Sequence, residues 1–270
     1  MNKIIFHKPL LPVVISFFLL ILISICSCSK SASKISVFAA AGAKPAIDDI
    51  SKMFEEEYKV KVEINYGGGG EVLSKMEIAK SGDIYIAPEQ KFMSVARDKD
   101  VVEPETIRVV AYMIPVIVVQ KGNPKQIHGL NDLFKPKMRV AVVRDETTLL
   151  GKYAVEIFRK AGLTKSIKKN IVTEAARPDG VITMLIAGQV DAAITWHFYQ
   201  YLAPDKIENI FFLPEELTGI GEMQIAVSQY SRNKKLSEQF VDFAVSSEGK
   251  AIFKKHGYII ETNGLKKYWH

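Results

Sequence analysis

The sequence predicts an α/β fold of two domains, the second inserted into the first, and three observations carry this prediction. From residue 35 to about residue 95, β-prone stretches alternate with amphipathic helical stretches over short connections, which favours a parallel sheet. Residues 107–120 form a β-prone run longer than an ordinary strand of about 5–6 residues, and Pro115 interrupts it. Residues 210–213 form a second such stretch, ended by Pro214. We interpret both stretches as strands that cross between two sheets and form a hinge.

The length and charge of the chain limit its partners. The 270 residues suffice for one large domain or two of moderate size, and 48% hydrophobic with 24% charged residues is an ordinary globular composition. The net charge is +6, or +4 once Lys3 and Lys8 are subtracted, because both lie in a segment that we expect to be cleaved. This mild excess suits an anionic small molecule or an anionic membrane surface, and we expect no nucleic-acid partner.

Residues 1–28 are typical of an export signal. An almost wholly apolar run at 10–25 follows the first lysines and is short for a membrane span of about 20 residues. It ends at the two cysteines of the chain, and the segment resembles a bacterial lipoprotein signal, in which a cysteine receives lipid. We predict that Cys28 is lipidated, because the small Ser27 precedes it. Lipidation of Cys26, a retained transmembrane anchor and simple secretion are the alternatives.

Residues 29–34 are expected to form a polar tether that leads into domain I. We assign residues 34–113 and 220–270 to domain I, and residues 115–218 to domain II. In domain I, apolar residues spaced by three and four predict helices and alternating residues predict strands. The expected order is a strand from 35, helix 46–58, strand 60–64, a helix from 71 to about 79, strand 83–88, a helix from 92, strand 223–227, and helices 236–245 and 248–256.

Domain II repeats the alternation of helices and strands. Its pattern predicts a short helix at 130–134, strand 139–143, helix 149–161, strand 171–173, helix 181–187 and strand 191–195. The helix at 149–161 is the best supported of these, because its apolar residues share one face and Gly162 ends it. A ligand in a fold of this kind is expected in the cleft between the two domains.

Four strand-to-helix turns carry the functional prediction, because the first N–H groups of a helix have no partner within it and attract anions. The turns are 41–44, 67–70, 145–148 and 177–180. Four successive glycines at 67–70 allow backbone N–H groups to face a ligand, although a tight turn without a ligand is the alternative. Thr147 or Thr148 fits the role of an N-cap as well as it fits a role in ligand binding. We expect Asp179 to be an N-cap and the N–H group of Gly180 to be free for a ligand.

Three larger side chains are candidates for the same cleft. Lys44 lies at a helix start, where a cation opposes the helix dipole, so an anionic ligand explains it better than local stability does. A lysine that turns to solvent is the alternative, and Arg177 is a similar case. Trp196 follows a strand and either walls the cleft or packs in the core. His128 and the other histidines are isolated, and no nucleophile or metal motif is present, so we predict no enzyme activity and no metal site.

These motifs resemble, in order, those of the molybdate/tungstate-type substrate-binding proteins of ABC importers, over roughly residues 35–260. The motifs are Phe38-Ala-Ala-Ala-Gly-Ala-Lys-Pro, Tyr66-Gly-Gly-Gly-Gly, the run from Gly82 to Met93, Lys121-Gly-Asn-Pro, Gly151-Lys-Tyr-Ala and Asp191-Ala-Ala-Ile-Thr-Trp. The resemblance implies a type II periplasmic-binding-protein fold, in which two mixed sheets flanked by helices are joined by two crossing strands. It also implies a tetrahedral oxyanion that is held by N–H groups and hydroxyls, without a metal or cofactor.

Carried onto this chain, the family pattern and the turns together predict ten ligand-binding residues: Gly42, Ala43, Lys44, Gly69, Gly70, Thr148, Leu150, Asp179, Gly180 and Trp196. The chain departs from the pattern where the best-known molybdate binders carry serines, since Gly42 and Gly69 stand there instead. The family's aromatic hydroxyl falls at Trp196, which donates only through its indole. We therefore place this chain in a divergent subgroup of the family.

The resemblance leads to one expected function and three alternatives. We expect a monomeric, exported lipoprotein, anchored to a membrane, that captures molybdate or tungstate between its domains and delivers it to an ABC permease. The first alternative keeps the fold and replaces the ligand with an organic or phosphorylated anion. The others are a surface antigen or adhesin with residual anion binding, and an enzyme that acts on a phosphorylated or acylated substrate.

Overall fold

The computed structural model describes residues 33–146 and 148–265. The predicted export signal, both cysteines and most of the tether lie outside the described residues. From Lys34 onward the chain belongs to one compact unit. None of the helices in the described ranges is long and apolar enough to cross a membrane.

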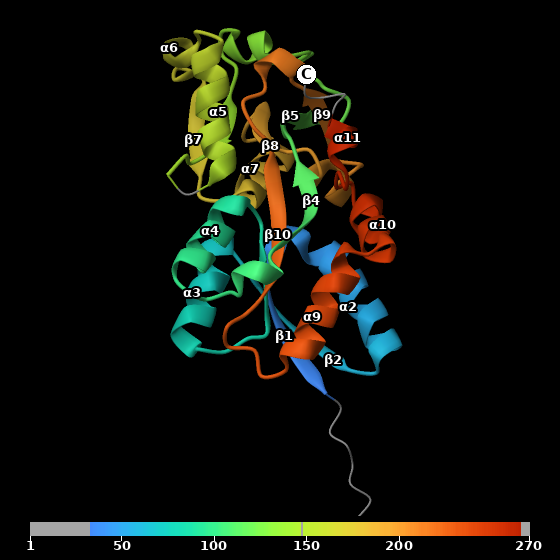
Figure 1. The fold of residues 1–270 in the computed structure, drawn as a ribbon. Coiled ribbons are helices and arrows are strands. Elements are labelled where there is room, and N and C mark those ends of the chain that lie inside the picture. The colour runs from blue at the N-terminus through green and yellow to red at the C-terminus, as the bar shows by residue number, and fades with distance from the viewer. Residues whose placement is uncertain (1–32, 147, 266–270) are drawn as a thin grey trace, which may run out of the picture. The chain divides into compact units, whose positions relative to one another are not determined.

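The first sheet has the strand order β2-β1-β3-β10-β4 (Figure 1). β1 (Lys34–Ala40) lies parallel to β2 (Lys61–Gly67) and to β3 (Ile84–Ala87). β10 (Gly221–Val227) runs antiparallel between β3 and β4 (Arg108–Met113). The sheet is therefore mixed, and the late strand β10 returns to it as the sequence predicts.

Helices cover both faces of the first sheet (Figure 1). α2 (Lys44–Tyr58), α9 (Lys234–Val245) and α10 (Ser247–Lys255) lie on one face, and α3 (Gly69–Ala79) and α4 (Gln90–Asp98) on the other. The alternation of β1 explains both cores, because Val37 joins the cluster that contains Phe54 of α2, while Phe38 joins the cluster that contains Met76 of α3. We call this sheet and these helices the first lobe.

The second sheet has the order β7-β6-β8-β5-β9 and is also mixed. β6 (Val140–Val143) is parallel to β7 (Ile171–Ala175) and β8 (Ala192–Trp196), and β5 (Pro115–Gln120) is antiparallel to β8 and β9 (Ile207–Phe211). Its helices are α5 (Leu149–Lys160), α6 (Thr164–Ile167), α7 (Pro178–Ile186) and α8 (Tyr199–Leu202). This sheet and these helices form the second lobe.

The chain passes between the sheets where Pro115 interrupts the long β-prone run. β4 pairs in the first sheet and β5 in the second, with only Ile114 between them, so the first predicted crossing is confirmed. The second crossing is misplaced in the sequence prediction. β9 ends within the second sheet at Phe211, and Pro214 begins the short 3-10 turn Pro214–Glu216 before the chain reaches β10. The predicted domain boundaries stay a prediction.

The remaining short elements connect the lobes' strands and helices. They are the 3-10 turns Ala41–Ala43, Pro104–Thr106 and Leu130–Phe134, and the short helix α11 (Thr262–Leu265). The turn Ala41–Ala43 joins β1 directly to α2, which places the start of that helix at the carboxyl edge of the first sheet.

Candidate functional site

A cavity of about 550 Å³ lies where the two lobes meet. Its first-lobe wall contains the turn after β1, the glycine run and the end of β3, and its second-lobe wall contains the starts of α5 and α7 and the end of β8. The lining residues are Ala40–Ala43, Gly67–Glu71, Pro88, Glu89, Phe92, Met113 and Met223 from the first lobe, and Thr148, Ala176–Asp179, Trp196, Phe198, Tyr199 and Leu202 from the second. Each of the four turns predicted from the sequence therefore contributes at least one residue to the lining of this cavity.

The first-lobe wall is made mostly of backbone. Gly42, Ala43, Gly69 and Gly70 all line the cavity, as the sequence predicts. Gly69 and Gly70 are the first two residues of α3, so their N–H groups have no acceptor four residues earlier in the helix. The Gly68 N–H already donates to Glu71 Oε2 at 3.1 Å. The N–H groups of Gly69 and Gly70 are thus the donors that this wall offers to an anion.

The structure leaves little room for a side chain at Gly42 and Gly69, the two positions where the resemblance led us to expect serines. A Cβ atom at Gly69 would lie 2.5 Å from Pro88 Cγ, closer than two carbon atoms can approach without movement. A Cβ atom at Gly42 would lie 3.1 Å from the hydroxyl oxygen of Tyr199. Tyr199 therefore brings a hydroxyl from the second lobe to the place that a side chain at Gly42 would occupy. Burial raises the pKa of Tyr199, which keeps this hydroxyl protonated and able to donate.

The start of α5 is already occupied by a carboxylate of the protein. Glu89, at the end of β3 in the first lobe, accepts a hydrogen bond from the Leu149 N–H at 2.7 Å. Glu89 is only 2% exposed. Burial raises the pKa of its carboxyl group, and the N–H groups of Leu149, Leu150 and the Trp196 indole oppose that rise. The Leu149 N–H at the start of α5 is therefore not free for a ligand, and the role of Leu150 in ligand binding stays a prediction.

Thr148 and Leu150 have structural roles at the same helix start. Thr148 lines the cavity and is the N-cap of α5, since its Oγ1 accepts the Gly151 N–H at 3.0 Å. This confirms the N-cap interpretation. Leu150 is fully buried and does not line the cavity.

The start of α7 contributes an ion pair. Arg177 Nη2 lies 2.7 Å from Asp179 Oδ2, and Arg177 Nε donates to the other carboxylate oxygen at 3.1 Å. Both residues line the cavity, and both side chains are about half exposed. The expectation that Asp179 is an N-cap is wrong, because the N-cap is Arg177 and Asp179 lies in the first turn. Gly180 does not line the cavity, and its N–H donates to the Arg177 carbonyl at 3.1 Å.

Lys44 has local partners that the sequence reasoning did not foresee. Its Nζ lies 2.8 Å from Asp48 Oδ2, one helical turn later, and 4.6 Å from the centre of the Tyr66 ring. The side chain is 57% exposed and is not part of the cavity lining. The claim that local stability does not explain this lysine is therefore wrong, since the ion pair and the ring contact hold it on the outside of α2.

Trp196 fits both interpretations that the sequence left open. It is 3% exposed and packs edge-on against Tyr153, with 6.3 Å between ring centres, yet it also lines the cavity. Its indole N–H acts as a donor that helps to lower the pKa of Glu89. Burial raises the pKa of Tyr153 to about 12, and the nearby carboxylate of Glu89 contributes to this rise.

Glu89 and Tyr199 are two of the lining residues that sequence reasoning missed. Glu89 had a detectable signal, since an acidic residue directly follows a buried strand and Pro88. Tyr199 had none, because its position depends on the approach of the second lobe to Gly42. The ligand-binding roles of all these residues stay predictions.

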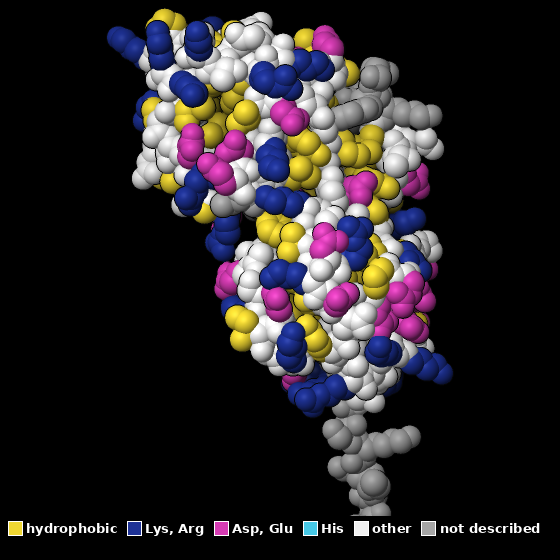
Figure 2. All heavy atoms as spheres, turned by 60° about the vertical axis from the view of Figure 1, so that its left-hand side comes forward, with side chains coloured by type: hydrophobic (Ala, Val, Ile, Leu, Met, Phe, Trp, Pro, Cys, Tyr) yellow, Lys and Arg dark blue, Asp and Glu magenta, His cyan; other side chains and the backbone are white. Residues whose placement is uncertain are grey.

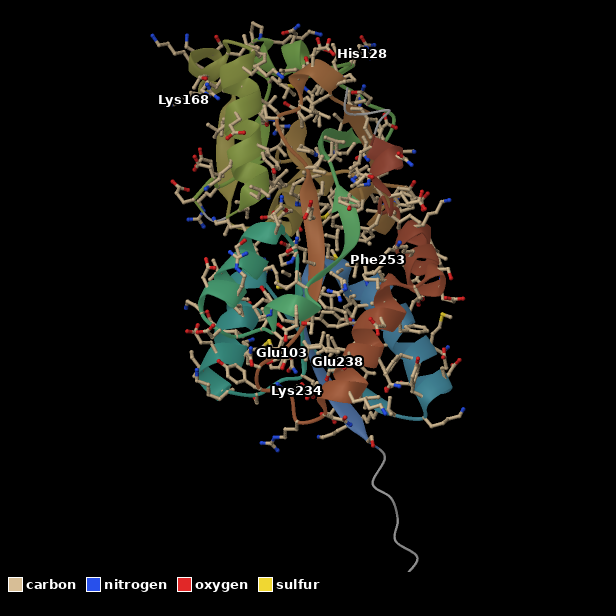
Figure 3. The ribbon with its side chains drawn as sticks, in the orientation of Figure 1. Glu103, His128, Lys168, Lys234, Glu238 and Phe253 are labelled. Carbon is tan, nitrogen blue, oxygen red and sulfur yellow. The ribbon has the colours of Figure 1, made fainter. Side chains whose placement is uncertain are left out.

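Charged groups also lie far from the cavity, in both lobes. In Figure 3, His128 and Lys168 lie at the far end of the second lobe, whereas Glu103 and its ion-pair partner Lys234 lie low in the first lobe. On the face in Figure 2, Lys and Arg side chains are spread over both lobes and mixed with Asp and Glu. Among the described residues, no group of three His, Cys, Asp or Glu side chains is placed to hold a metal ion.

Comparisons with known proteins agree with this architecture. YvgL of Bacillus subtilis strain 168, which has been assigned the name of an ABC transporter substrate-binding lipoprotein, is 22% identical over 249 residues, 89% of this chain and 94% of YvgL. The molybdate-binding protein ModA of Escherichia coli K12 is 23% identical over 233 residues, 84% of this chain and 90% of ModA. The crystal structure of L-phospholactate-bound PEB3, a protein of Campylobacter jejuni, covers 84% of this chain and 100% of its own at 22% identity, with a TM-score of 0.72.

The family described as "Bacterial extracellular solute-binding protein" matches residues 35–259, which is nearly the whole of the described chain. This match confirms the resemblance drawn from the motifs, and the shared architecture confirms the type II periplasmic-binding-protein fold. The chain therefore belongs to the bacterial extracellular solute-binding protein family.

Proposed function

We propose that this protein captures a small anion in the cavity between its lobes and delivers it to an ABC permease. The observation that carries the proposal is the lining of the cavity by backbone N–H groups at the start of α3, together with Arg177 and the Tyr199 hydroxyl from the opposite wall. A helix start and a guanidinium group both favour a phosphate or carboxylate. The anion is the cargo of the protein, and we expect no resident cofactor.

The size of the cavity favours an organic anion. If each oxygen of a tetrahedral oxyanion takes roughly the 30 Å³ share of a water molecule, the whole ion needs roughly 120 Å³. The cavity holds about 550 Å³, and Phe92, Trp196 and Phe198 add apolar surface to its walls. Such a site suits a phosphate or carboxylate group that is attached to a small carbon skeleton. The same fold accommodates L-phospholactate in PEB3.

Molybdate or tungstate is the second candidate ligand. It is supported by the molybdate-binding relative from Escherichia coli and by the backbone donors that remain at Gly69 and Gly70. Two features count against it, namely the glycines in place of the family's serines and the occupation of α5 by Glu89.

Delivery and anchoring follow from the expected mode of action. A ligand that contacts both lobes adds to the contacts that hold them together, and the permease would recognise the closed protein with its ligand bound. We propose that the protein acts as a monomer, held to the membrane by lipid on Cys28. The name of the Bacillus subtilis relative supports a lipoprotein.

The proposal is tested by measuring the melting temperature of the full chain, in mild detergent, with a panel of anions. The panel contains molybdate, tungstate, sulfate, phosphate and three-carbon phosphates and carboxylates. A ligand at a hundredfold excess over its dissociation constant adds about 2.7 kcal/mol of stability, or about 5–10 °C for a chain of this length. We expect the largest rise with an organic anion. A larger rise with molybdate or tungstate supports the second candidate, and no rise with any anion contradicts anion capture.

A further inference from the structure

Glu89 makes its contacts away from its own helix. It stands at the N-cap position of α4, yet its side chain makes no capping hydrogen bond there. Its backbone is extended, with φ −149° and ψ 148°, and it directly follows Pro88. The carboxylate instead crosses to the second lobe, where it accepts the Leu149 N–H at 2.7 Å. Figure 1 shows α4 of the first lobe directly beneath α5 of the second.

The carboxyl group of Glu89 meets the donors at the start of α5. The N-cap Thr148 satisfies the Gly151 N–H, which leaves the N–H groups of Leu149 and Leu150 as the open donors of the first turn of α5. The Leu149 N–H donates to Glu89 at 2.7 Å, and the Leu150 N–H and the Trp196 indole, which comes from a different element, help to lower the pKa of the same carboxyl group against the effect of burial. The group is almost fully buried, since Glu89 is 2% exposed. This arrangement is what an anionic ligand would otherwise use in the second lobe.

We propose that Glu89 is a built-in occupant of the α5 anion site, which confines the acidic group of the ligand to the glycine run and Arg177. This inference rests on the proposed function and gives a physical reason why the cavity would prefer a longer anion to a bare tetrahedral oxyanion. A bare tetrahedral oxyanion that needs donors from both lobes finds the start of α5 already bound to the carboxyl group of Glu89. A longer anion places its acidic group at Gly69, Gly70 and Arg177 and its carbon skeleton toward the aromatic wall.

The decisive variant is Glu89→Ala, because it empties the site without adding a new hydrogen-bonding group. In this variant a small carboxylate can replace the missing one, so formate is the probe and chloride at equal ionic strength is the control. The matched variant is Glu248→Ala, which removes a glutamate from the first turn of α10, away from the cavity. All measurements use the full chain with leucine labelled by nitrogen-15.

We expect formate to raise the melting temperature of Glu89→Ala saturably and to shift the amide resonances of Leu149 and Leu150. The wild-type protein and Glu248→Ala should show a smaller rise, from formate at the glycine run alone, and no shift of these two resonances. An equal response of all three proteins to formate and chloride overturns the proposal. Because this result does not depend on the natural ligand, the α5 site can be demonstrated even if the wild-type protein captures no anion.

Glu89→Gln tests the same inference if Glu89→Ala fails to fold. The amide oxygen of glutamine keeps one acceptor at α5 but removes the negative charge. We expect the dissociation constant for molybdate, measured by calorimetry, to fall about tenfold or more relative to the wild-type protein, because a charge-assisted contact is worth about that factor. An unchanged or larger dissociation constant overturns the proposal.

Discussion

Gly69 and Gly70 are adjacent in sequence but differ in the space around them. A Cβ atom at Gly69 would lie 2.5 Å from Pro88 Cγ and 3.0 Å from Phe92, whereas one at Gly70 would lie 3.4 Å from Phe92. We predict that Gly69→Ser lowers the free energy of unfolding by about 1–3 kcal/mol, the usual cost of overpacking. Gly70→Ser is the matched control and should change it much less. Urea denaturation of both variants measures the difference, and equal losses would show that Pro88 does not restrict the site.

Arg177 and Lys44 are two cations whose positions lead us to expect different effects on anion binding when each is replaced. Arg177 lines the cavity, whereas Lys44 pairs with Asp48 outside it. For the anion that gives the largest thermal shift, we predict that Arg177→Met weakens binding about tenfold or more, the equivalent of about 1.4 kcal/mol. Lys44→Met should leave the dissociation constant within about a factor of two, because an exposed ion pair contributes little. Calorimetry on both variants measures the two dissociation constants. A larger effect of Lys44→Met would show that Lys44 takes part in anion binding.

The sequence predicts well which residues line the cavity where the backbone places them there, and poorly where contacts between side chains determine their position. The glycine run and Ala43 follow from a strand that leads into a helix, and both line the cavity. The sequence prediction placed Lys44 wrongly, because it left out the ion pair that this lysine forms with Asp48, four residues later in the helix. Glu89 was missed because its partner lies 60 residues later in the chain. A local pattern marks an acidic residue after a buried strand, but it does not reveal that this carboxyl group reaches a helix of the other lobe.

At the scale of elements, one ion pair joins the starts of β6 and β8. Asp191 accepts the Arg139 N–H at 2.9 Å and pairs with its guanidinium, with Nη2 2.8 Å from Oδ1. Burial alone would raise the pKa of Asp191, but its bonds to Arg139 outweigh that effect and hold the pKa below the ordinary value of 3.8. The charged form of Asp191 therefore stabilises the fold.

We predict that Asp191→Asn lowers the free energy of unfolding by about 1–3 kcal/mol at neutral pH, since a charge-assisted hydrogen bond is weakened. The pKa of Asp191 is lower in the folded than in the unfolded protein, so its contribution is complete above the unfolded value of about 3.9 and disappears as pH falls through the folded value. The difference between wild-type and variant should therefore shrink below about pH 4. Denaturation at several pH values measures it, and a constant difference would contradict the account.

Helices and strands were predicted more reliably than the second crossing. The alternation in β2, the helical spacing in α2 and α5, and Pro115 at the start of β5 are local signals, and local physics dominates there. The return from β9 to β10 runs through an irregular segment, and the sequence prediction shortened it to a single strand. The course of this segment depends on where the two lobes meet, and no periodic pattern in the sequence predicts that.

For the whole molecule, several contacts join the lobes without a ligand. Besides the Glu89 contacts, Lys91 Nζ donates to the Glu146 carbonyl at 3.1 Å, and the rings of Phe198 and Tyr258 stack with centres 4.4 Å apart. We predict that the ligand-free wild-type protein is mostly closed, so small-angle X-ray scattering changes little when ligand is added. Ligand-free Glu89→Ala should be more expanded and should contract with ligand, because the loss of about 1.5–3 kcal/mol shifts the closed population. A large contraction of the wild-type protein would contradict this.

The central claim is that an anion binds between the lobes at the glycine run and Arg177. The most direct measurement is a crystal structure of the full chain with the anion that gives the largest thermal shift. We predict that its acidic group accepts hydrogen bonds from the Gly69 and Gly70 N–H groups and contacts Arg177, while Glu89 stays at α5. An anion bound outside the cavity, or one that displaces Glu89 and leaves the glycine run empty, would contradict the account.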